Sequence, residues 1–322
     1  MENIYFSPIG ELYKIPIESL SETFASEHKL YRLSSTRELV VNEGAKDIKK
    51  AVLYGGIEYE TDIVTMTEES AKYAVKRGFE QTVDTEQLNI RSGAGYLPGT
   101  LSEVRNIDKS LTDAHIQHQL LTDIYGTEDS FKYLSGHNTD MMHIATHGFY
   151  WSDSEAQSAN NLAFLMFANE WDSRQYIEDK ALTRSGLLFS GANNALNGVA
   201  VPEGVDDGIL TAREISMLDL RGLDLAVLSA CQTGLGEITG DGVFGLQRGF
   251  KKAGANTLMM SLWKVDDKAT QLLMSRFYDN LLGGKTKYES LYEAQTYLKN
   301  YGAGQYKNPK YWAAFILLDG VN

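Results

Sequence analysis

The sequence predicts an α/β fold in which a mostly parallel sheet is flanked by helices on both faces. Apolar runs at residues 141–148, 223–230 and 257–262 are short and rich in Met or branched side chains, which is typical of strands buried in a parallel sheet. Segments with helical patterns separate these runs. Because strands that alternate with helices pair in parallel, the alternation indicates one layered sheet with helices above and below it.

The N-terminal part, residues 1–94, is expected to open with a β-hairpin and to supply the first strands. Residues 4–8 and 11–16 form the two arms of this hairpin, joined at Ile9 and Gly10. The apolar run at residues 51–56 ends in glycine and predicts the first central strand. Residues 57–94 are polar and poorly periodic, so we interpret them as a variable insertion or a subdomain boundary.

The remaining elements are expected in residues 95–322. Thr100 is the predicted N-cap of a helix that follows the turn at Pro98 and Gly99, and Thr127 opens a helix over 127–134. The patterns further along predict strands at 187–189 and 312–318 and helices at 211–217, 243–252, 269–282 and 288–299.

Composition limits the classes of function. The net charge of −13 argues against a nucleic-acid partner or an anionic membrane surface and favours a basic substrate. The single cysteine, Cys231, permits no internal disulfide, so a reducing, cytoplasmic location is expected. The N-terminus lacks a signal-peptide pattern, and no apolar run approaches the roughly 20 residues that cross a bilayer.

Cys231 directly follows the apolar run at 223–230 and precedes Gln232-Thr233-Gly234, and His147 lies at the end of the run at 141–148, directly before Gly148. In open α/β sheets, ligand-binding and catalytic groups collect at the carboxyl edge of the strands, so both side chains are expected there. A thiol is weakly ionised at neutral pH and needs a nearby imidazole to take its proton before it attacks a carbonyl. The sequence therefore predicts a thiol nucleophile with a histidine base, although it identifies no third residue that orients the histidine.

Other interpretations of these residues were weighed. A lone Cys is often a small buried side chain, but the glycines that follow Cys231 favour a functional turn. His143 is better explained as a histidine satisfied in the core. Residues 240–245 match G-x-G-x-x-G without directly following a strand, His143 and His147 lack the glutamate of a zinc motif, and Ser229 is not in a serine-hydrolase elbow. We therefore expect no metal and no cofactor.

Several motifs in order resemble the CHAT family, a group of caspase-like cysteine peptidases related to separase. The motifs are LSSTREL at 33–39, HG at 147–148, DGILTA at 207–212, LSACQTG at 228–234, GDGVFGL at 240–246, AGA at 253–255, SLWKVDD at 261–267 and YWAAF at 311–315. They cover essentially the whole chain, with the departure concentrated at 57–94. The resemblance implies a caspase-like fold, with residues 1–94 as the N-terminal part of the CHAT domain and 95–322 as its catalytic part.

The resemblance also implies roles for individual residues. Cys231 matches the nucleophile, His147 the general base, and the backbone N–H groups of Gly148 and Cys231 the oxyanion hole. Asp267 matches an acidic residue of the separase S1 pocket, which would make the enzyme cleave after a basic P1 residue. Asp267 fits a second role equally well, as the cap of the helix near residue 269. Asp206 and Asp207 are the other acidic candidates for substrate binding.

Members of this family are usually attached to tetratricopeptide repeats. The expected partners are therefore a protein substrate and a tetratricopeptide-repeat or other regulatory partner. The alternative function is a catalytically silent caspase-like module for signalling or assembly, against which the presence of both Cys231 and His147 argues.

Overall fold

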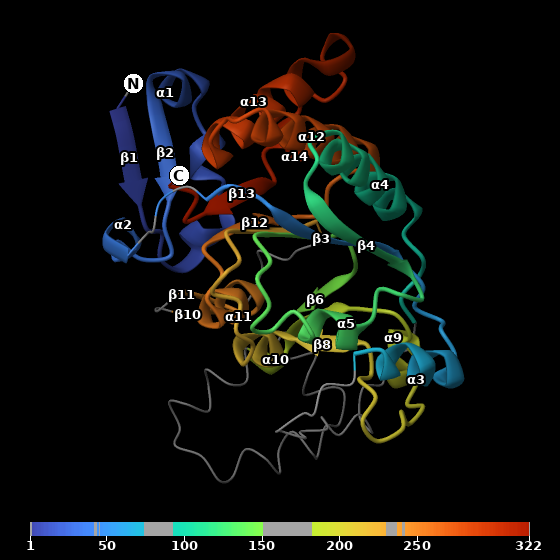
Figure 1. Ribbon diagram of the computed structural model, residues 1–322. Helices are drawn as coiled ribbons and strands as arrows, with labels where there is room; N and C mark the ends of the chain where they lie inside the picture. The colour runs from blue at the N-terminus through green and yellow to red at the C-terminus, as the bar shows by residue number, and fades with distance from the viewer. Residues whose placement is uncertain are drawn as a thin grey trace.

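A computed structural model describes residues 2–41, 44, 46–73, 93–150, 182–229, 237–239 and 242–321. Figure 1 shows a central sheet with helices on both faces. The eight strands of this sheet lie in the order β1-β2-β13-β12-β9-β5-β3-β4. Their bounds are β1 Glu2–Phe6, β2 His28–Arg32, β3 Lys50–Ile57, β4 Gln117–Asp123, β5 Met141–Ile144, β9 Leu225–Leu228, β12 Thr257–Ser261 and β13 Phe315–Leu318.

All neighbouring strands of the sheet run parallel except β12 and β13, which are antiparallel. The predicted fold class is therefore confirmed. Two smaller sheets accompany it: β6 Gly148–Tyr150, β7 Ser185–Leu188 and β8 Ile209–Thr211 form one, and β10 Glu237–Thr239 and β11 Gly242–Phe244 form the other.

One face of the large sheet is covered by α4 (Pro98–Asp113), α12 (Asp267–Leu282) and α13 (Lys287–Asn300), with α14 (Pro309–Trp312) beside them. The other face packs against α5 (Glu128–Lys132), α10 (Ala212–Ser216) and α11 (Leu246–Ala253). The remaining helical segments among the described residues are η1 Gly10–Lys14, η2 Ile17–Ser19, α1 Glu22–Glu27, α2 Glu38–Val41, α3 Ile63–Ala71, α9 Ala192–Leu196 and η3 Tyr301–Ala303.

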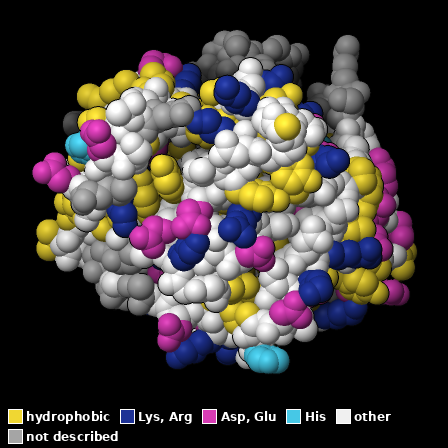
Figure 2. All heavy atoms as spheres, turned by 90° about the horizontal axis from the view of Figure 1, so that it is seen from above, with side chains coloured by type: hydrophobic (Ala, Val, Ile, Leu, Met, Phe, Trp, Pro, Cys, Tyr) yellow, Lys and Arg dark blue, Asp and Glu magenta, His cyan; other side chains and the backbone are white. Residues whose placement is uncertain are grey.

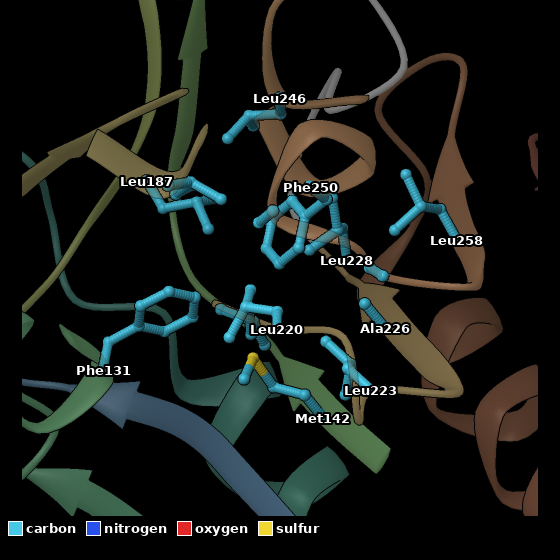
Figure 3. Packing of buried hydrophobic residues seen from close by; sticks show 14 of the residues in the cluster. Phe131, Met142, Leu187, Leu220, Leu223, Ala226, Leu228, Leu246, Phe250 and Leu258 are labelled. Carbon is cyan, nitrogen blue, oxygen red and sulfur yellow. The ribbon is translucent and has the colours of Figure 1, made fainter. Parts of the chain in front are cut away.

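Strand β5 explains why the central runs are apolar throughout. Met142 and Ile144 lie in the core on the face that α5, α10 and α11 cover, where Phe131 and Phe250 also pack (Figure 3). Met141 and Ala145 lie in the core on the opposite face, which α4 and α12 cover. Side chains alternate between the two faces of a strand, so a strand covered on both faces needs apolar residues at consecutive positions.

The predicted N-terminal hairpin is wrong. The second arm is the 3-10 helix η1, and β1 pairs in parallel with β2 instead. A two-residue hairpin turn of the common type requires positive φ at both central residues, whereas Ile9 has a φ of −130° and only Gly10 is positive, at +54°. The β-branched Ile9 thus prevents the tight turn.

Smaller differences concern helix starts and one strand. Helix α4 begins at Pro98 with Leu97 as its N-cap, so Thr100 lies inside the first turn, where its hydroxyl accepts a hydrogen bond from the Gly56 N–H. Helix α11 begins at Leu246, because residues 242–244 form β11 and Gly245 has a φ of +131°. Strand β4 was not predicted, since its sequence QHQLLTD is largely polar at the edge of the sheet.

The face of the molecule in Figure 2 carries charges of both signs. On the face that Figure 2 presents, Lys and Arg side chains alternate with Asp and Glu side chains, and hydrophobic side chains lie between them in small groups. Within the described part of the chain, no helix is both long enough and apolar enough to span a membrane.

Candidate active site

The carboxyl ends of β5 and β9 are joined just before the candidate residues. The Ser229 N–H, one residue past β9, donates a hydrogen bond of 2.9 Å to the carbonyl of Ile144, the last residue of β5. His147 follows Ile144 by three positions in the chain, and Cys231 follows Ser229 by two. Cys231 itself lies outside the described residues.

The His147 ring is anchored by a backbone carbonyl. Its Nε2 lies 2.7 Å from the carbonyl oxygen of Gly95, in the segment that leads into α4. A carbonyl oxygen only accepts hydrogen bonds, so Nε2 carries the hydrogen of this contact. In the neutral ring Nδ1 is then the basic nitrogen. The contact thus selects the tautomer that leaves Nδ1 able to take a proton.

Tyr59 supports His147 from the side of β3. The two rings pack with centroids 5.1 Å apart, and the His147 N–H donates to the Tyr59 hydroxyl at 3.3 Å. That hydroxyl also lies 2.8 Å from Thr146 Oγ1, which donates to the Leu188 carbonyl. The Thr146 hydroxyl has one hydrogen and donates it to the Leu188 carbonyl. The Tyr59 hydroxyl therefore donates to Thr146 Oγ1 and accepts from the His147 N–H.

Burial of Tyr59, which is 1% exposed, raises its pKa to about 12. The hydroxyl therefore keeps its proton at neutral pH, and the hydrogen-bond directions described above persist. Strand β5 lies between β3 and β9. The contacts of Tyr59 support His147 from the side of β3, and β9, the strand that leads to Cys231, lies on the other side.

Gly148 begins β6 directly after His147. It is half-buried and stands opposite Leu187 in the antiparallel pair of β6 with β7. The Leu188 N–H donates to the His147 carbonyl at 2.9 Å, so the small sheet fixes the backbone on both sides of residue 148. The predicted role of the Gly148 N–H in the oxyanion hole remains a prediction.

Asp267 lies in the exposed first turn of α12. The N-cap of this helix is Asp266, whose carboxylate accepts from the Ala269 N–H at 3.0 Å, so the predicted capping role of Asp267 is wrong. A Cβ built on Gly99 would lie 2.9 Å from Asp267 Oδ2. The carboxylate therefore lies against the start of α4, four positions along the chain from Gly95.

Asp206 and Asp207 belong to a charged cluster around Lys132. The ammonium nitrogen lies 2.6 Å from Glu128, 2.8 Å from Glu214 and 3.0 Å from Asp206. Asp207 Oδ1 accepts from the Ile209 N–H at 2.8 Å. Burial raises the pKa of Asp207 to about 7 and also raises that of Glu128. Both aspartates thus have partners within the protein, whereas the carboxylate of Asp267 is exposed.

His143 is a core residue, as the sequence predicted. The side chain is fully buried, with Nδ1 3.0 Å from the Tyr278 hydroxyl and Nε2 3.0 Å from Glu103 Oε1. It joins β5 to α4 and α12 and does not contact His147. Among the described residues, no group of three or more His, Cys, Asp and Glu side chains is arranged to hold a metal ion.

A family model of the CHAT domain matches residues 1–320. The chain belongs to the CHAT domain family. Tetratricopeptide repeat protein 28 of Mus musculus is 37% identical over 111 residues, and the protein of the same name from Homo sapiens is 34% identical over 110 residues. Each match takes in 34% of this chain and spans only 4% of the length of the relative.

Two crystal structures of the Saccharomyces cerevisiae separase–securin complex have TM-scores of 0.48 with this fold, at 11% and 12% sequence identity. They cover 95% of this chain and 15% and 14% of the matched chains. The family assignment rests on the CHAT domain match, and the fold class rests on the strand order and directions of the structure itself.

The contacts of His147 in this CHAT domain come from a part of the sequence that the motifs do not cover. Tyr59 and Gly95 lie within or just after residues 57–94, which the sequence analysis treated as a variable insertion. A backbone carbonyl has no sequence signal, because every residue has one. Tyr59 offered only the weak signal of an aromatic residue shortly after a strand.

Proposed function

We propose that this CHAT domain is a cysteine endopeptidase that cleaves protein substrates with Cys231 as nucleophile and His147 as general base. The observation that carries the proposal is the 2.7 Å contact of His147 Nε2 with the Gly95 carbonyl. It holds the hydrogen on Nε2 and leaves Nδ1 to accept a proton, which a general base requires. The link between Ser229 and Ile144 supports the pairing, because it joins the strand ends that precede the two residues.

In the proposed reaction, Nδ1 of His147 takes the thiol proton of Cys231 and the thiolate attacks the carbonyl carbon of the scissile peptide bond. Backbone N–H groups of Gly148 and Cys231 stabilise the oxyanion that forms. The imidazolium returns the proton to the leaving amine as the C–N bond breaks. Water, deprotonated by the same imidazole, then hydrolyses the thioester and frees the enzyme.

A basic P1 residue is part of the proposal, with Asp267 as its partner. Support comes from the exposure of its carboxylate and its position against Gly99, at the start of the helix that follows the Gly95 segment. Asp206 is a weaker partner because it is already paired with Lys132. The net charge of −13 favours the approach of cationic peptides. We further propose that the domain acts in a reducing, cytoplasmic compartment under a tetratricopeptide-repeat or other regulatory partner.

The test is a peptide-library cleavage assay on the wild type and on Cys231→Ala and His147→Ala. Both substitutions should abolish cleavage while circular dichroism stays unchanged. Cleavage by either variant at a near wild-type rate would contradict the dyad. The silent-module alternative is separated by a thiol-reactive peptide electrophile, which should label Cys231 in the wild type. A wild type that neither cleaves the library nor reacts with the electrophile would support the silent module instead.

A further inference from the structure

The Gly95 carbonyl that anchors His147 lies next to a residue whose backbone is held by one side chain. Asn193 of α9 is 1% exposed, and its Oδ1 accepts from the Ala94 N–H at 2.7 Å while its Nδ2 donates to the Ala94 carbonyl at 3.1 Å. Both polar groups of the residue before Gly95 are therefore bound by one amide. Such a paired contact holds the two peptide units that flank Ala94 better than a single bond does.

The Asn193 amide is fixed in turn. Its Nδ2 also donates to Glu60 Oε1 at 2.6 Å, and its backbone N–H donates to the Tyr59 carbonyl at 3.1 Å. These contacts define which end of the amide is oxygen, because only the nitrogen can donate to a carboxylate and a carbonyl. Asn193 thus binds Tyr59 and Glu60 on one side and Ala94 on the other.

His147 lies between the two segments that Asn193 joins. Tyr59 contacts its ring and backbone, and Gly95 contacts Nε2. We propose that Asn193 is a positioning residue for His147, which holds the Gly95 carbonyl where it selects the Nε2–H tautomer and orients Nδ1. The proposal rests on the peptidase function of this site, and it adds a residue that touches neither His147 nor the substrate.

The local backbone explains why a positioning residue is needed. Residues 93–97 form no regular secondary structure and include Gly93 and Gly95, whose backbone is free to adopt many conformations. A Cβ built on Gly93 would lie 2.9 Å from the Asn193 amide, so glycine there makes room for the side chain. Without Asn193, the segment would lose the bonds that hold Ala94, the residue directly before the Gly95 carbonyl.

Asn194 provides a matched control on the same helix. Its Nδ2 donates to the Thr61 carbonyl at 2.7 Å and to the Gly191 carbonyl at 3.1 Å, but none of its hydrogen bonds reaches residues 93–97. Asn194→Ala therefore removes a similar number of hydrogen bonds as Asn193→Ala without touching the Gly95 segment. A merely structural role for Asn193 predicts the same consequences for both substitutions.

The experiment records the imidazole ¹⁵N shifts of His147, which report the tautomer, together with kcat and KM on a peptide that the wild type cleaves. Asn193→Ala should convert His147 from the Nε2–H tautomer to a mixture and lower kcat by about 10- to 100-fold with KM nearly unchanged, as expected for a misplaced catalytic group. Asn194→Ala should leave the tautomer and kcat as in the wild type. Glu60→Gln should behave like the wild type, because the Gln oxygen still accepts from Asn193.

An unchanged tautomer and kcat in Asn193→Ala would overturn the proposal, as would equal changes in Asn194→Ala. If Asn193→Ala does not fold, Gly93→Ala tests the same contact, since the added methyl group would lie 2.9 Å from the Asn193 amide and force the amide and residue 93 apart. It should shift the tautomer in the same direction, and a wild-type tautomer there would also overturn the proposal. The ¹⁵N shifts report the His147 tautomer whether or not the protein cleaves peptides. A failed peptidase assay therefore contradicts the proposed function, while the ¹⁵N shifts still test the role of Asn193.

Discussion

The Nε2 atom of His147 and the carbonyl oxygen of Gly95 lie 2.7 Å apart, although the two residues are separated by 52 positions in the chain. The strands bring the end of β5 to the carboxyl edge of the sheet, but they do not orient the imidazole. Orientation comes from Tyr59 after β3 and from the segment before α4. The order of the strands therefore determines where the site lies, and the segments outside the strands determine how the imidazole is oriented.

The Tyr59 hydroxyl should contribute measurably to stability. Tyr59→Phe leaves the His147 N–H without its partner and removes a donor from Thr146, so we expect the free energy of unfolding to fall by about 1–3 kcal/mol. Urea denaturation measures this. Because the raised pKa of Tyr59 is about 12, the hydroxyl stays protonated in both folded and unfolded chains below about pH 9, and the difference should not vary from about pH 6 to 9.

Tyr292→Phe is the control for this substitution, since Tyr292 is 37% exposed. Removal of its hydroxyl should change stability by less than about 0.5 kcal/mol. Equal losses in the two variants would show that the hydrogen bonds of Tyr59 are not the cause.

Much of the fold could be predicted because burial on both faces leaves a strong signal. The runs that became β3, β5, β9 and β12 are apolar at consecutive positions, and the element that precedes each of them along the chain is a helix. The errors occur where burial is partial. Strand β4 alternates exposed and half-buried residues at the sheet edge, and β1 pairs with β2, which begins 22 positions after β1 ends, rather than with residues 11–16.

The candidate site was only half predictable, for a different reason. His147 and Cys231 have reactive side chains at strand ends, which the sequence displays. Gly95 acts through its carbonyl, and Asn193 acts on the backbone of Ala94 from 99 positions away. The sequence does not mark either residue for its role, because neither role requires a reactive side chain. The polar character of residues 57–94 suggested an insertion, whereas Tyr59 within this segment and Gly95 directly after it contact the histidine.

The buried trio of Glu103, His143 and Tyr278 should behave as one unit. His143→Leu leaves a buried carboxylate and a buried hydroxyl without their partner, so we expect a loss of about 3 kcal/mol in the free energy of unfolding. Glu103→Leu should cost a similar amount. The double variant should be destabilised by at least about 1 kcal/mol less than the sum of the two single variants, because the second substitution no longer breaks an intact contact.

Chemical denaturation of the four proteins in this cycle measures the coupling. Additive losses would contradict an energetic link between the two side chains. A folded His143→Leu variant should still react with the thiol-directed electrophile, because His143 does not contact His147.

Asp207 should make stability fall as pH rises. Its folded pKa is raised to about 7 from an unfolded value of 3.8, so the folded chain binds the extra proton between these values. The stabilising contribution is complete below about pH 4 and is lost as pH rises through about 7, at no more than about 1.4 kcal/mol per pH unit. Asp207→Asn keeps an acceptor for the Ile209 N–H, so its stability relative to the wild type should increase from about pH 4 to 7.

Asp219→Asn is a control of opposite sign. The hydrogen bond and charge of Arg221 lower the pKa of Asp219 to about 2, so its contribution exists above about pH 4 and is lost as pH falls through about 2. This variant should gain no stability relative to the wild type as pH rises. Denaturation curves at several pH values distinguish the two cases, and a pH-independent difference for Asp207→Asn would contradict the raised pKa.

The preference for a basic P1 residue should depend on Asp267. Asp267→Asn should lower kcat/KM for Arg and Lys peptides by about tenfold, or ~1.4 kcal/mol, which lies between the contribution of an exposed ion pair and that of a desolvated one. Matched peptides with Leu at P1 should be affected little. The control is Asp266→Asn, which removes the same charge one position away while Asn still caps α12. If the wild type prefers Leu, or if both variants reduce cleavage after Arg equally, Asp267 does not bind the P1 side chain. In the latter case the preference for Arg arises from the overall negative charge of the protein. Added salt should then lower kcat/KM for all cationic peptides by a similar factor.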